Sequence, residues 1–380
     1  MALQPFRIDF GEDAIADLQR RIDETRWPSI PFATGWSAGT DDGVLRDLVR
    51  YWREEFDWFE VQDSLNRFTH LRGPIGDAGE ALHCVVLGAG EGRTPLLLLH
   101  GWPGSFIELL PAAQLLADGA GGAPGFEVVV PSLPGYGFSE APREPGMHPG
   151  RIAERMHALM TELGHERYGV QGGDWGSIVG ARLAHQQPQA VLGLHLNFPA
   201  GIVQRQPGEE LPAEEVEWRE QMAEWRDLEG AYGHIQGTKP QTLAYSLNDS
   251  PVGLLAWILE KFEAWSEPGE LWETFDRDAV LANVTLYWLT GTALSAARTY
   301  YESRRESPPF RAASRPPAPM AFARFRGEPW TAPRPLVERS FNLVRWSEPE
   351  RGGHFAAMEQ PQLFAEDVAA FFAEVAAGEA

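Results

Sequence analysis

The sequence predicts an α/β protein, in which a mostly parallel central sheet is flanked by helices and a helical lid is inserted between two of its strands. Three observations support this fold class. Short apolar segments alternate with helical segments over residues 81–197, and such alternation is typical of a parallel sheet. Over residues 201–310 the chain becomes helical and rich in tryptophan. Strand patterns resume after the proline-rich residues 307–319, which are expected to form a connector.

The N-terminal residues 6–72 have the periodicity of helices rather than of strands. Amphipathic helices are expected at residues 13–26 and 42–59, with prolines and glycines between them. Because those residues interrupt a helical pattern, we expect separate helices. Residues 1–75 are therefore predicted to form a helical meander that wraps the main domain.

The core of the predicted domain comprises residues 76–200 and 318–380, and the lid comprises residues 201–317. Strands are expected at residues 81–87, 95–99, 126–130, 168–171, 191–196, 320–325 and 341–346, and a last amphipathic helix at 361–375. Cys84 falls in the first of these strands, where a free cysteine is usually buried. The core is expected to form one sheet, with the lid projecting from it as an insertion.

The glycine-rich residues 88–92 resemble a dinucleotide-binding fingerprint. A strand follows them instead of a helix, so no helix N-terminus is available to hold a pyrophosphate. We interpret these residues as a hairpin loop.

Composition excludes several classes of partner. The 32 basic and 54 acidic residues give a formal net charge of −22, and basic residues form no run, which argues against binding nucleic acid or an anionic membrane. One cysteine permits no intrachain disulfide. The N-terminus lacks the pattern of a signal peptide, and the longest apolar run is far short of the about 20 residues that cross a bilayer. We expect a cytoplasmic protein without a membrane anchor.

The residues 172–176, Gly-Gly-Asp-Trp-Gly, have the pattern of a nucleophile elbow, a sharp turn between a strand and a helix. Most such elbows carry serine, but here Asp174 occupies the nucleophile position. An apolar run precedes the motif and a helix-compatible run follows it, as the elbow requires. Asp174 is therefore the candidate nucleophile.

An aspartate nucleophile restricts the substrate. Serine attacking an sp³ carbon would make an ether, which water cannot cleave, whereas a carboxylate attacking the same carbon makes an ester, which water can hydrolyse. Asp174 therefore indicates alkyl substrates, namely epoxides or haloalkanes.

Several motifs together resemble the α/β-hydrolase-fold epoxide hydrolases, specifically the microsomal and juvenile-hormone type with an N-terminal meander. The resemblance spans nearly the whole chain and includes an inserted helical lid. It rests on five matches in order: His100-Gly101-Trp102-Pro103-Gly104-Ser105, Gly172 to Ser177, Tyr232 to Pro240, Leu247 to Gly253, and Arg351-Gly352-Gly353-His354-Phe355.

The resemblance implies a catalytic base and an acid that orients it. His354 lies in a glycine-rich loop after the last strand, which is the place of the base. Glu328 follows the strand at residues 320–325, where this family has its acid. Asn197 ends the preceding strand, where some relatives place the acid, and an amide cannot perform that role. Other acids nearby that could be mistaken for it are Glu338, Glu348 and Glu350. His100 and His195 are expected to be structural.

The resemblance also implies two lid tyrosines that protonate the departing oxygen. Tyr232 and Tyr300 occupy the matching positions, and Tyr301 is the neighbour that could be confused with the second. Two phenols can hold an epoxide oxygen, and one of them can release its proton as the alkoxide forms.

The loop at residues 100–104 is expected to form one wall of an oxyanion hole. The backbone N–H groups of Trp102 and Trp175 would stabilise the anion that forms during ester hydrolysis. The side chains of Trp102, Pro103 and Trp175 are expected to bind substrate. Whether the Trp102-Pro103 peptide is cis is left open.

The implied function is a two-step hydrolysis of a hydrophobic epoxide, with or without an aryl substituent, to a vicinal diol. It proceeds through a covalent alkyl ester of Asp174 and needs water but no cofactor. No metal site is expected either, because the sequence lacks the usual ligand spacings. The alternatives are a haloalkane dehalogenase and a catalytically silent ligand binder with the same fold. The particular epoxide, the regiochemistry and enantiopreference, a detoxifying or biosynthetic role, and a homodimer are left open.

Overall fold

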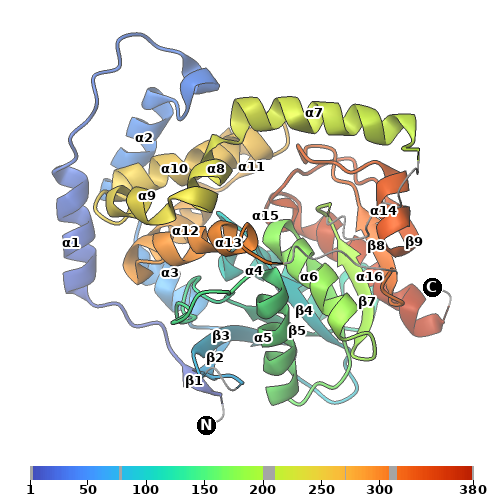
Figure 1. Cartoon of the computed structure of the whole chain (residues 1–380). Helices are drawn as coiled ribbons and strands as arrows, with labels where there is room; N and C mark the ends of the chain where they lie inside the picture. Colours follow the sequence, from blue (N-terminus) through green and yellow to red (C-terminus); the bar gives the residue numbers. More distant parts are fainter. Residues whose placement is uncertain (1–2, 77–78, 200–209, 270, 308–314, 379–380) are drawn as a thin grey trace.

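The fold is described from a computed structural model, which defines residues 3–76, 79–199, 210–269, 271–307 and 315–378. Its strands form a nine-stranded sheet in the order β1-β2-β3-β5-β4-β6-β7-β8-β9 (Figure 1). The strands are β1 (Gln4–Phe6), β2 (Thr69–Pro74), β3 (Ala81–Leu87), β4 (Pro95–Leu99), β5 (Glu127–Pro131), β6 (Tyr168–Gly172), β7 (Val191–Leu196), β8 (Pro319–Ala323) and β9 (Asn342–Ser347). Pairing is antiparallel from β1 to β5 and parallel from β5 to β9. The predicted fold class is confirmed.

The expected hairpin at residues 88–92 is wrong. Strand β3 pairs with β2 and β5, and β4 pairs with β5 and β6, so β3 and β4 are not neighbours. Residues 88–94 lie between the two strands, and this connection is longer than the 2–5 residues typical of hairpins. It is long enough to pass across β5.

Apolar side chains of the sheet are buried alternately on its two faces. In β4, Leu96 and Leu98 belong to one buried cluster and Leu97 and Leu99 to the other, as the two-residue period of a strand requires. Helices α4 (Phe106–Asp118) and α16 (Pro361–Ala377) pack together on the first face, with α15 (Ala356–Glu359) beside them. Helices α5 (Pro149–Glu162) and α6 (Asp174–Gln186) cover the second face. Both faces of the central strands are therefore closed to solvent. Cys84 is buried in β3, as predicted.

The N-terminal meander, residues 3–76, differs in detail from the prediction. It contains α1 (Glu12–Asp23), a 3₁₀ turn at Gly35–Ala38, α2 (Asp42–Glu54) and α3 (Trp58–Leu65). The single helix expected at 42–59 is split, because Asp57 caps a new helix by accepting a hydrogen bond from the Phe59 N–H group at 2.7 Å. The meander also adds β1 and β2 to the sheet. Neither strand was expected, because β1 has three residues and β2 contains glycine and proline.

The helical lid lies over the carboxyl end of the parallel strands, and α7 runs across the top of Figure 1. Its helices in the described residues are α7 (Ala213–Glu229), α8 (Ala231–Thr238), α9 (Pro240–Leu247), α10 (Pro251–Trp265), α11 (Leu271–Thr274), α12 (Arg277–Thr290) and α13 (Ala293–Ser303). The expected boundary between residues 200 and 201, and most of the expected proline-rich connector, lie outside the described residues.

No single helix in the described ranges is long and apolar enough to cross a membrane. Helices α12 and α13 reach such a length and apolar composition only when they are taken together, and they are bent by 89° relative to each other.

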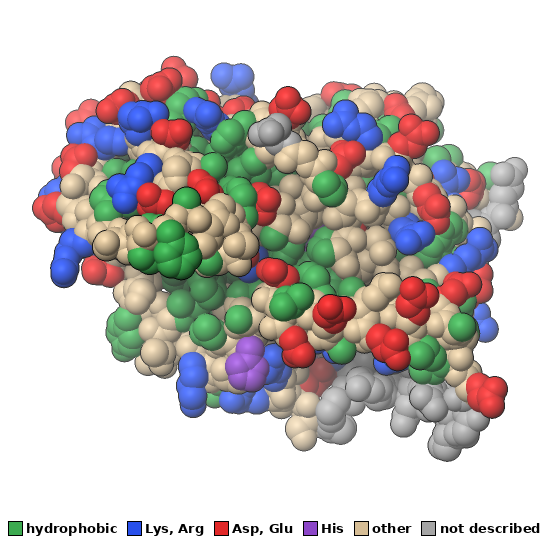
Figure 2. Space-filling model, turned by 90° about the horizontal axis from the view of Figure 1, so that it is seen from above, with side chains coloured by type: hydrophobic (Ala, Val, Ile, Leu, Met, Phe, Trp, Pro, Cys, Tyr) green, Lys and Arg blue, Asp and Glu red, His purple; other side chains and the backbone are tan. Residues whose placement is uncertain are grey.

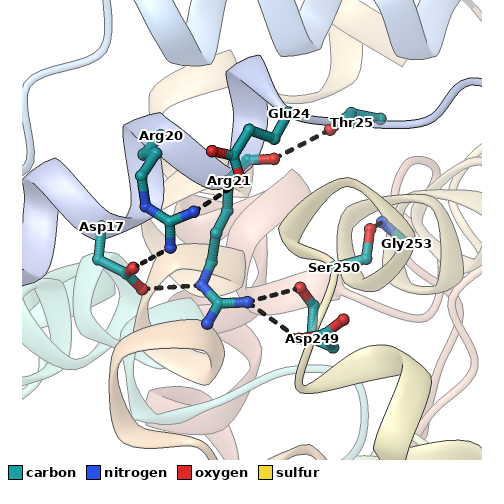
Figure 3. A network of polar contacts seen from close by, with 8 residues as sticks. All are labelled: Asp17, Arg20, Arg21, Glu24, Thr25, Asp249, Ser250 and Gly253. Atoms are coloured by element: carbon teal, nitrogen blue, oxygen red, sulfur yellow. Dashed lines mark hydrogen bonds and ion pairs between the residues drawn. The ribbon is translucent and has the colours of Figure 1, made fainter.

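Polar contacts join the meander to the lid (Figure 3). The Arg21 guanidinium on α1 contacts Asp17 on its own helix at 2.8 Å, and it reaches the carboxylate and the backbone carbonyl of Asp249 at 3.0 Å each. Asp249 lies in the short connection between α9 and α10. Deeper in the same interface, the Trp52 indole N–H donates to the Thr285 hydroxyl at 3.0 Å, and both residues are buried. The meander therefore holds the lid by both exposed and buried contacts.

The face seen from above in Figure 2 carries acidic and basic side chains interspersed around its rim, with hydrophobic side chains nearer the middle. The large negative charge is thus spread among charges of both signs. The described residues on this face form no continuous basic surface of the kind that nucleic acids require.

Candidate active site

Asp174 lies at the turn from β6 into α6. Its φ angle is 46°, and it is the one non-glycine residue in the described part of the chain with a positive φ. Such a conformation costs about 1–3 kcal/mol. A Cβ atom at Gly176 would overlap the carbonyl oxygen of Leu99, and one at Gly172 would overlap the carbonyl oxygen of Gly176. The elbow therefore requires glycine at both positions, and it projects the Asp174 side chain from the end of the sheet.

The loop after β4 contacts the Asp174 carboxylate directly. The Trp102 N–H group donates to Asp174 Oδ1 at 2.8 Å, and a Cβ atom at Gly101 would overlap the carboxylate. The peptide between Trp102 and Pro103 is cis. The Trp175 N–H group lies in the first turn of α6, where backbone donors have no partner within the helix. The predicted oxyanion donors therefore flank the predicted nucleophile from two different elements.

The lid holds this loop from above. Asn283 and Tyr287, both on α12, donate hydrogen bonds to the carbonyl oxygens of Pro103 and Gly104, each at 2.8 Å. Both donors are buried. A shift of α12 would therefore move the loop that carries the Trp102 N–H group.

His354 and Glu328 lie beside Asp174, and these three residues form what we call the floor of the site. The His354 Nδ1 atom is 2.7 Å from Glu328 Oε2, and its Nε2 atom is 3.5 Å from Asp174 Oδ2. His354 and Glu328 are 6% and 4% exposed. Glu328 also accepts a hydrogen bond from the Trp330 N–H group at 3.0 Å, which fixes its orientation.

The other acids and histidines considered from the sequence lie elsewhere. Asn197 lines the pocket beside Asp174, where it accepts a hydrogen bond from the Gln171 amide at 2.9 Å. His195 is buried against Asp367, and His100 accepts from the Leu133 N–H group. The remaining acids, Glu338, Glu348 and Glu350, are exposed.

Two carboxylates control the charge of His354. Burial by itself lowers the pKa of His354, but the negative charges of Glu328 and Asp174 outweigh burial and raise it to about 10. At neutral pH the imidazole is therefore positively charged. Neutralising Asp174 would remove one of the two charges that raise this pKa.

Tyr232 on α8 and Tyr300 on α13 form the other side of the site. Their rings contact each other, with centroids 5.9 Å apart. The Trp102 indole stacks on Tyr232 at 5.3 Å and meets Tyr300 edge-on at 5.9 Å. Trp175 also contacts Tyr300, at 4.8 Å. Both phenols therefore pack on the tryptophans that flank Asp174.

Tyr301 occupies a different environment. Its ring lies 3.4 Å from the guanidinium carbon of Arg305 and 5.4 Å from that of Arg298. In the described residues, the tyrosine rings that contact Trp102 are those of Tyr232 and Tyr300. The packing thus distinguishes the predicted Tyr300 from its neighbour.

Burial raises the pKa of both lid phenols. For Tyr232 the charge of Asp174 adds to this effect, and a hydrogen bond from Tyr300 opposes it. For Tyr300, the neighbouring Tyr232 and then the charge of Asp174 raise the pKa further. Both side chains are consequently neutral at physiological pH and can donate hydrogen bonds.

Glu108 on α4 is a residue of the site that sequence reasoning missed. It lines the pocket together with Asp174 and His354, and its Oε2 atom is buried without a hydrogen-bond partner. Burial is the main reason that the pKa of Glu108 rises to about 8, and the charge of His354 opposes the rise. Free space beside these residues amounts to about 20 Å³, enough for about one water molecule. No sequence motif marks this glutamate.

Lys261 on α10 is the second residue that was missed. It is 3% exposed, and its Nζ atom lies 4.6 Å from the centroid of the Tyr232 ring. A signal for its burial existed in the sequence, because Lys261 lies at helical spacing from Ile258 and Trp265 on the apolar face of its helix.

No group of three or more His, Cys, Asp or Glu side chains that could hold a metal ion occurs in the parts of the chain that the structure describes. The predicted absence of metal and cofactor stays a prediction.

Comparisons with known proteins give consistent results. The model for the epoxide hydrolase N terminus matches residues 3–109, and the model for the alpha/beta hydrolase fold matches residues 94–234. A protein of Stigmatella aurantiaca (strain DW4/3-1) is 39% identical over 99% of this chain and 86% of its own length. Epoxide hydrolase 1 of Oryctolagus cuniculus is 35% identical over 97% of this chain and 88% of its own. The crystal structure of juvenile hormone epoxide hydrolase from the silkworm Bombyx mori has a TM-score of 0.86 at 33% identity, covering 100% of this chain and 95% of that one.

Proposed function

This chain belongs to the epoxide hydrolases of the microsomal and juvenile-hormone type, and from that membership we propose how its own residues convert an epoxide to a vicinal diol. The observation that carries the proposal is the surroundings of Asp174. One carboxylate oxygen is held by the Trp102 N–H group, the other faces His354, and two neutral phenols pack on the adjacent tryptophans.

In the first step the Asp174 carboxylate attacks an epoxide carbon, and the C–O bond of the ring breaks. The electron pair moves to the epoxide oxygen, which takes a proton from a lid phenol. The product is a neutral alkyl ester of Asp174. The proton on His354 is then transferred to the phenolate, so the neutral phenol is restored and the imidazole becomes neutral.

Formation of the ester prepares His354 for the second step. The ester carries no charge, so one of the two carboxylates that hold the pKa of His354 high is removed. Neutral His354, still held by Glu328, takes a proton from water. The resulting hydroxide attacks the carbonyl carbon of the ester.

The tetrahedral anion that follows is stabilised by the backbone N–H groups of Trp102 and Trp175. Its collapse releases the diol, whose oxygen leaves with the proton from His354, and the new carboxylic acid returns a proton to the imidazole. One epoxide and one water are consumed, and the enzyme regains its starting charges. The space of about 20 Å³ beside Glu108 and His354 suits the attacking water.

The substrate is a hydrophobic epoxide. Indole rings of Trp102, Trp175 and Trp265 surround the two phenols, and such a surface binds apolar and aryl groups. Water is the second substrate.

The covalent intermediate can be trapped to test the proposal. His354→Gln removes the base and leaves the nucleophile, so this variant mixed with styrene oxide is expected to gain the mass of one epoxide on the peptide that contains Asp174. The wild-type enzyme is expected to release diol from the same substrate. Diol production by the wild type with no adduct in the variant would contradict the covalent mechanism, and halide release from haloalkanes without any diol would favour a dehalogenase.

The cytoplasmic location predicted from the sequence stays a prediction, which fractionation of cells with an antibody to this protein would test. Assembly of two copies is likewise open to measurement by light scattering.

A further inference from the structure

Lys261 is a buried cation that the mechanism above does not use. It lies on α10 with 3% of its surface exposed, and its Nζ atom is 2.5 Å from the carboxylate of the adjacent Glu260. Burying an ammonium group is costly, and an apolar side chain of similar volume is often as stable or more stable at such a position. Packing alone therefore does not account for a lysine here.

The rings around Lys261 belong to the active site. Its Nζ atom lies 4.6 Å from the centroid of the Tyr232 ring and 5.6 Å from that of the Trp265 ring. Trp265 in turn contacts both Tyr232 and His354, at 5.0 and 5.1 Å. Lys261 therefore contacts one of the two lid phenols directly.

The two phenols differ in this respect. The rings that contact Tyr300 are those of Trp102, Trp175 and Tyr232. Within the described ranges, the rings over which Lys261 lies are those of Tyr232 and Trp265, and Tyr300 is not among them. Each phenol also has a neighbour that favours its ionised form, Tyr300 for Tyr232 and Trp175 for Tyr300, so the cation is what distinguishes them.

We propose that Lys261 makes the two phenols unequal. Tyr232 gives its proton to the epoxide oxygen, while Tyr300 keeps its proton and donates a hydrogen bond to the same oxygen. This inference rests on the proposed epoxide opening. Lys261 is a positioning residue, because it acts through Tyr232 and does not touch the substrate.

The physical basis is the change in charge of the Tyr232 ring during the first step. A cation is attracted to a neutral ring by the ring's quadrupole, and it is attracted more strongly once the ring carries a negative charge. Asp174, Glu328 and Glu260 act in the opposite sense on Tyr232. Asp174 loses its charge as the ester forms, so its opposition declines when the proton leaves, whereas Lys261 stays beside the ring.

Double-mutant cycles on the rate constant of ester formation test this inference. Lys261→Met is expected to slow ester formation about 30-fold, the size of a desolvated cation–ring interaction. The loss should persist in a Tyr300→Phe background and largely disappear in a Tyr232→Phe background. Rapid quench and mass measurement of the adduct provide the rate constant, and Lys261→Arg, which keeps the charge, should retain most of the wild-type rate.

Glu260→Gln distinguishes this role from a structural ion pair. Removal of the Glu260 charge leaves Lys261 uncompensated, so ester formation should stay as fast or become faster. A structural pair would instead make Glu260→Gln and Lys261→Met equally slow. Equal losses for Lys261→Met in both tyrosine backgrounds, or no loss at all, would overturn the inference. If Lys261→Met does not fold, Lys261→Gln serves in the same cycles.

A failure of this inference can be told apart from a failure of the proposed function. If the wild type forms neither ester nor diol, the proposed function is at fault. If the wild type forms both and the cycles show no preference for Tyr232, only the role of Lys261 is wrong.

Discussion

The floor of the site and the lid meet beside Asp174, but different kinds of contact hold them. Asp174, Glu328 and His354 each follow a strand of one sheet, and short hydrogen bonds to neighbouring side chains and backbone fix them. The lid phenols are held by ring packing and by helices that depend on the N-terminal meander. The floor is thus built into the core, whereas the position of the lid depends on residues distant in sequence.

Hydrogen bonds join the two regions in addition to ring contacts. The backbone carbonyl oxygen of the lid residue Trp265 accepts a hydrogen bond from the backbone N–H group of His354 at 2.8 Å. Glu359, next to the His354 loop, accepts from the Glu267 and Phe355 N–H groups at 2.8 and 2.9 Å. The comparison teaches that damage to the floor should abolish chemistry, whereas damage to the lid or its supports should slow particular steps.

The largest effect is expected from the floor. Asp174→Ala removes the nucleophile, and the rate of diol formation should fall by about 10⁴-fold or more. Binding of an unreacted epoxide, followed by quenching of tryptophan fluorescence, should persist because the lid is untouched. A variant that retained substantial turnover would show that another group attacks the epoxide.

A smaller effect is expected from the lid phenols. Tyr232→Phe should slow ester formation by about 10²-fold and Tyr300→Phe by a smaller factor, while hydrolysis of an ester already formed should change much less in both variants. Rapid-quench measurements separate the two rate constants. If both steps slowed equally, the phenols would be supporting the floor instead of protonating the epoxide oxygen, and Tyr301→Phe provides a matched control.

The pH dependence sharpens the comparison, because it reports on the floor alone. Below the pKa that His354 has in the ester, the rate constant of ester hydrolysis should rise about tenfold for each unit of increasing pH, because the base must be neutral. Glu328 is one of the charges that raise this pKa. Glu328→Gln should therefore move the rise to lower pH and reduce the plateau. A profile that is flat from pH 5 to 10, or one that shifts upward in this variant, would contradict the assigned pair.

The smallest effect is expected from the contact between the meander and the lid. Arg21→Ala removes the link to Asp249, whose side chain is 82% exposed, so the free energy of unfolding should fall by about 1 kcal/mol or less. Arg20→Ala is the matched control, because Arg20 pairs with Asp17 and Glu24 on its own helix. The difference between the two variants should vanish in high salt. A larger loss for the control would contradict a role for this contact in holding the lid.

The sequence predicts the position of Asp174 because local backbone requirements define the elbow. The elbow needs glycines at fixed positions around Asp174, and such a requirement leaves a readable pattern. Glu328 and His354 follow strands whose periodicity is visible, but their expected roles came from the resemblance to known epoxide hydrolases. The resemblance to known epoxide hydrolases supplied the lid tyrosines, since nothing local distinguishes Tyr300 from Tyr301.

The parts that the sequence does not predict depend on long-range contacts. The order of β3, β5 and β4 is set by pairing across the sheet, and no local pattern encodes it. Glu108 resembles a surface residue of an amphipathic helix, and its burial arises from the loop and the His354 segment that cover it. Lys261 shows its buried position through helical spacing, but the ring that it contacts lies on another helix.

The central claim, that Asp174 becomes covalently bonded to the substrate carbon, is tested most directly by a single turnover in ¹⁸O-labelled water. With enzyme in excess over epoxide, the oxygen gained by the diol should come unlabelled from Asp174, and the label should appear in the Asp174 carboxylate. Label that appears in the diol during this first turnover, with none in Asp174, would contradict the account.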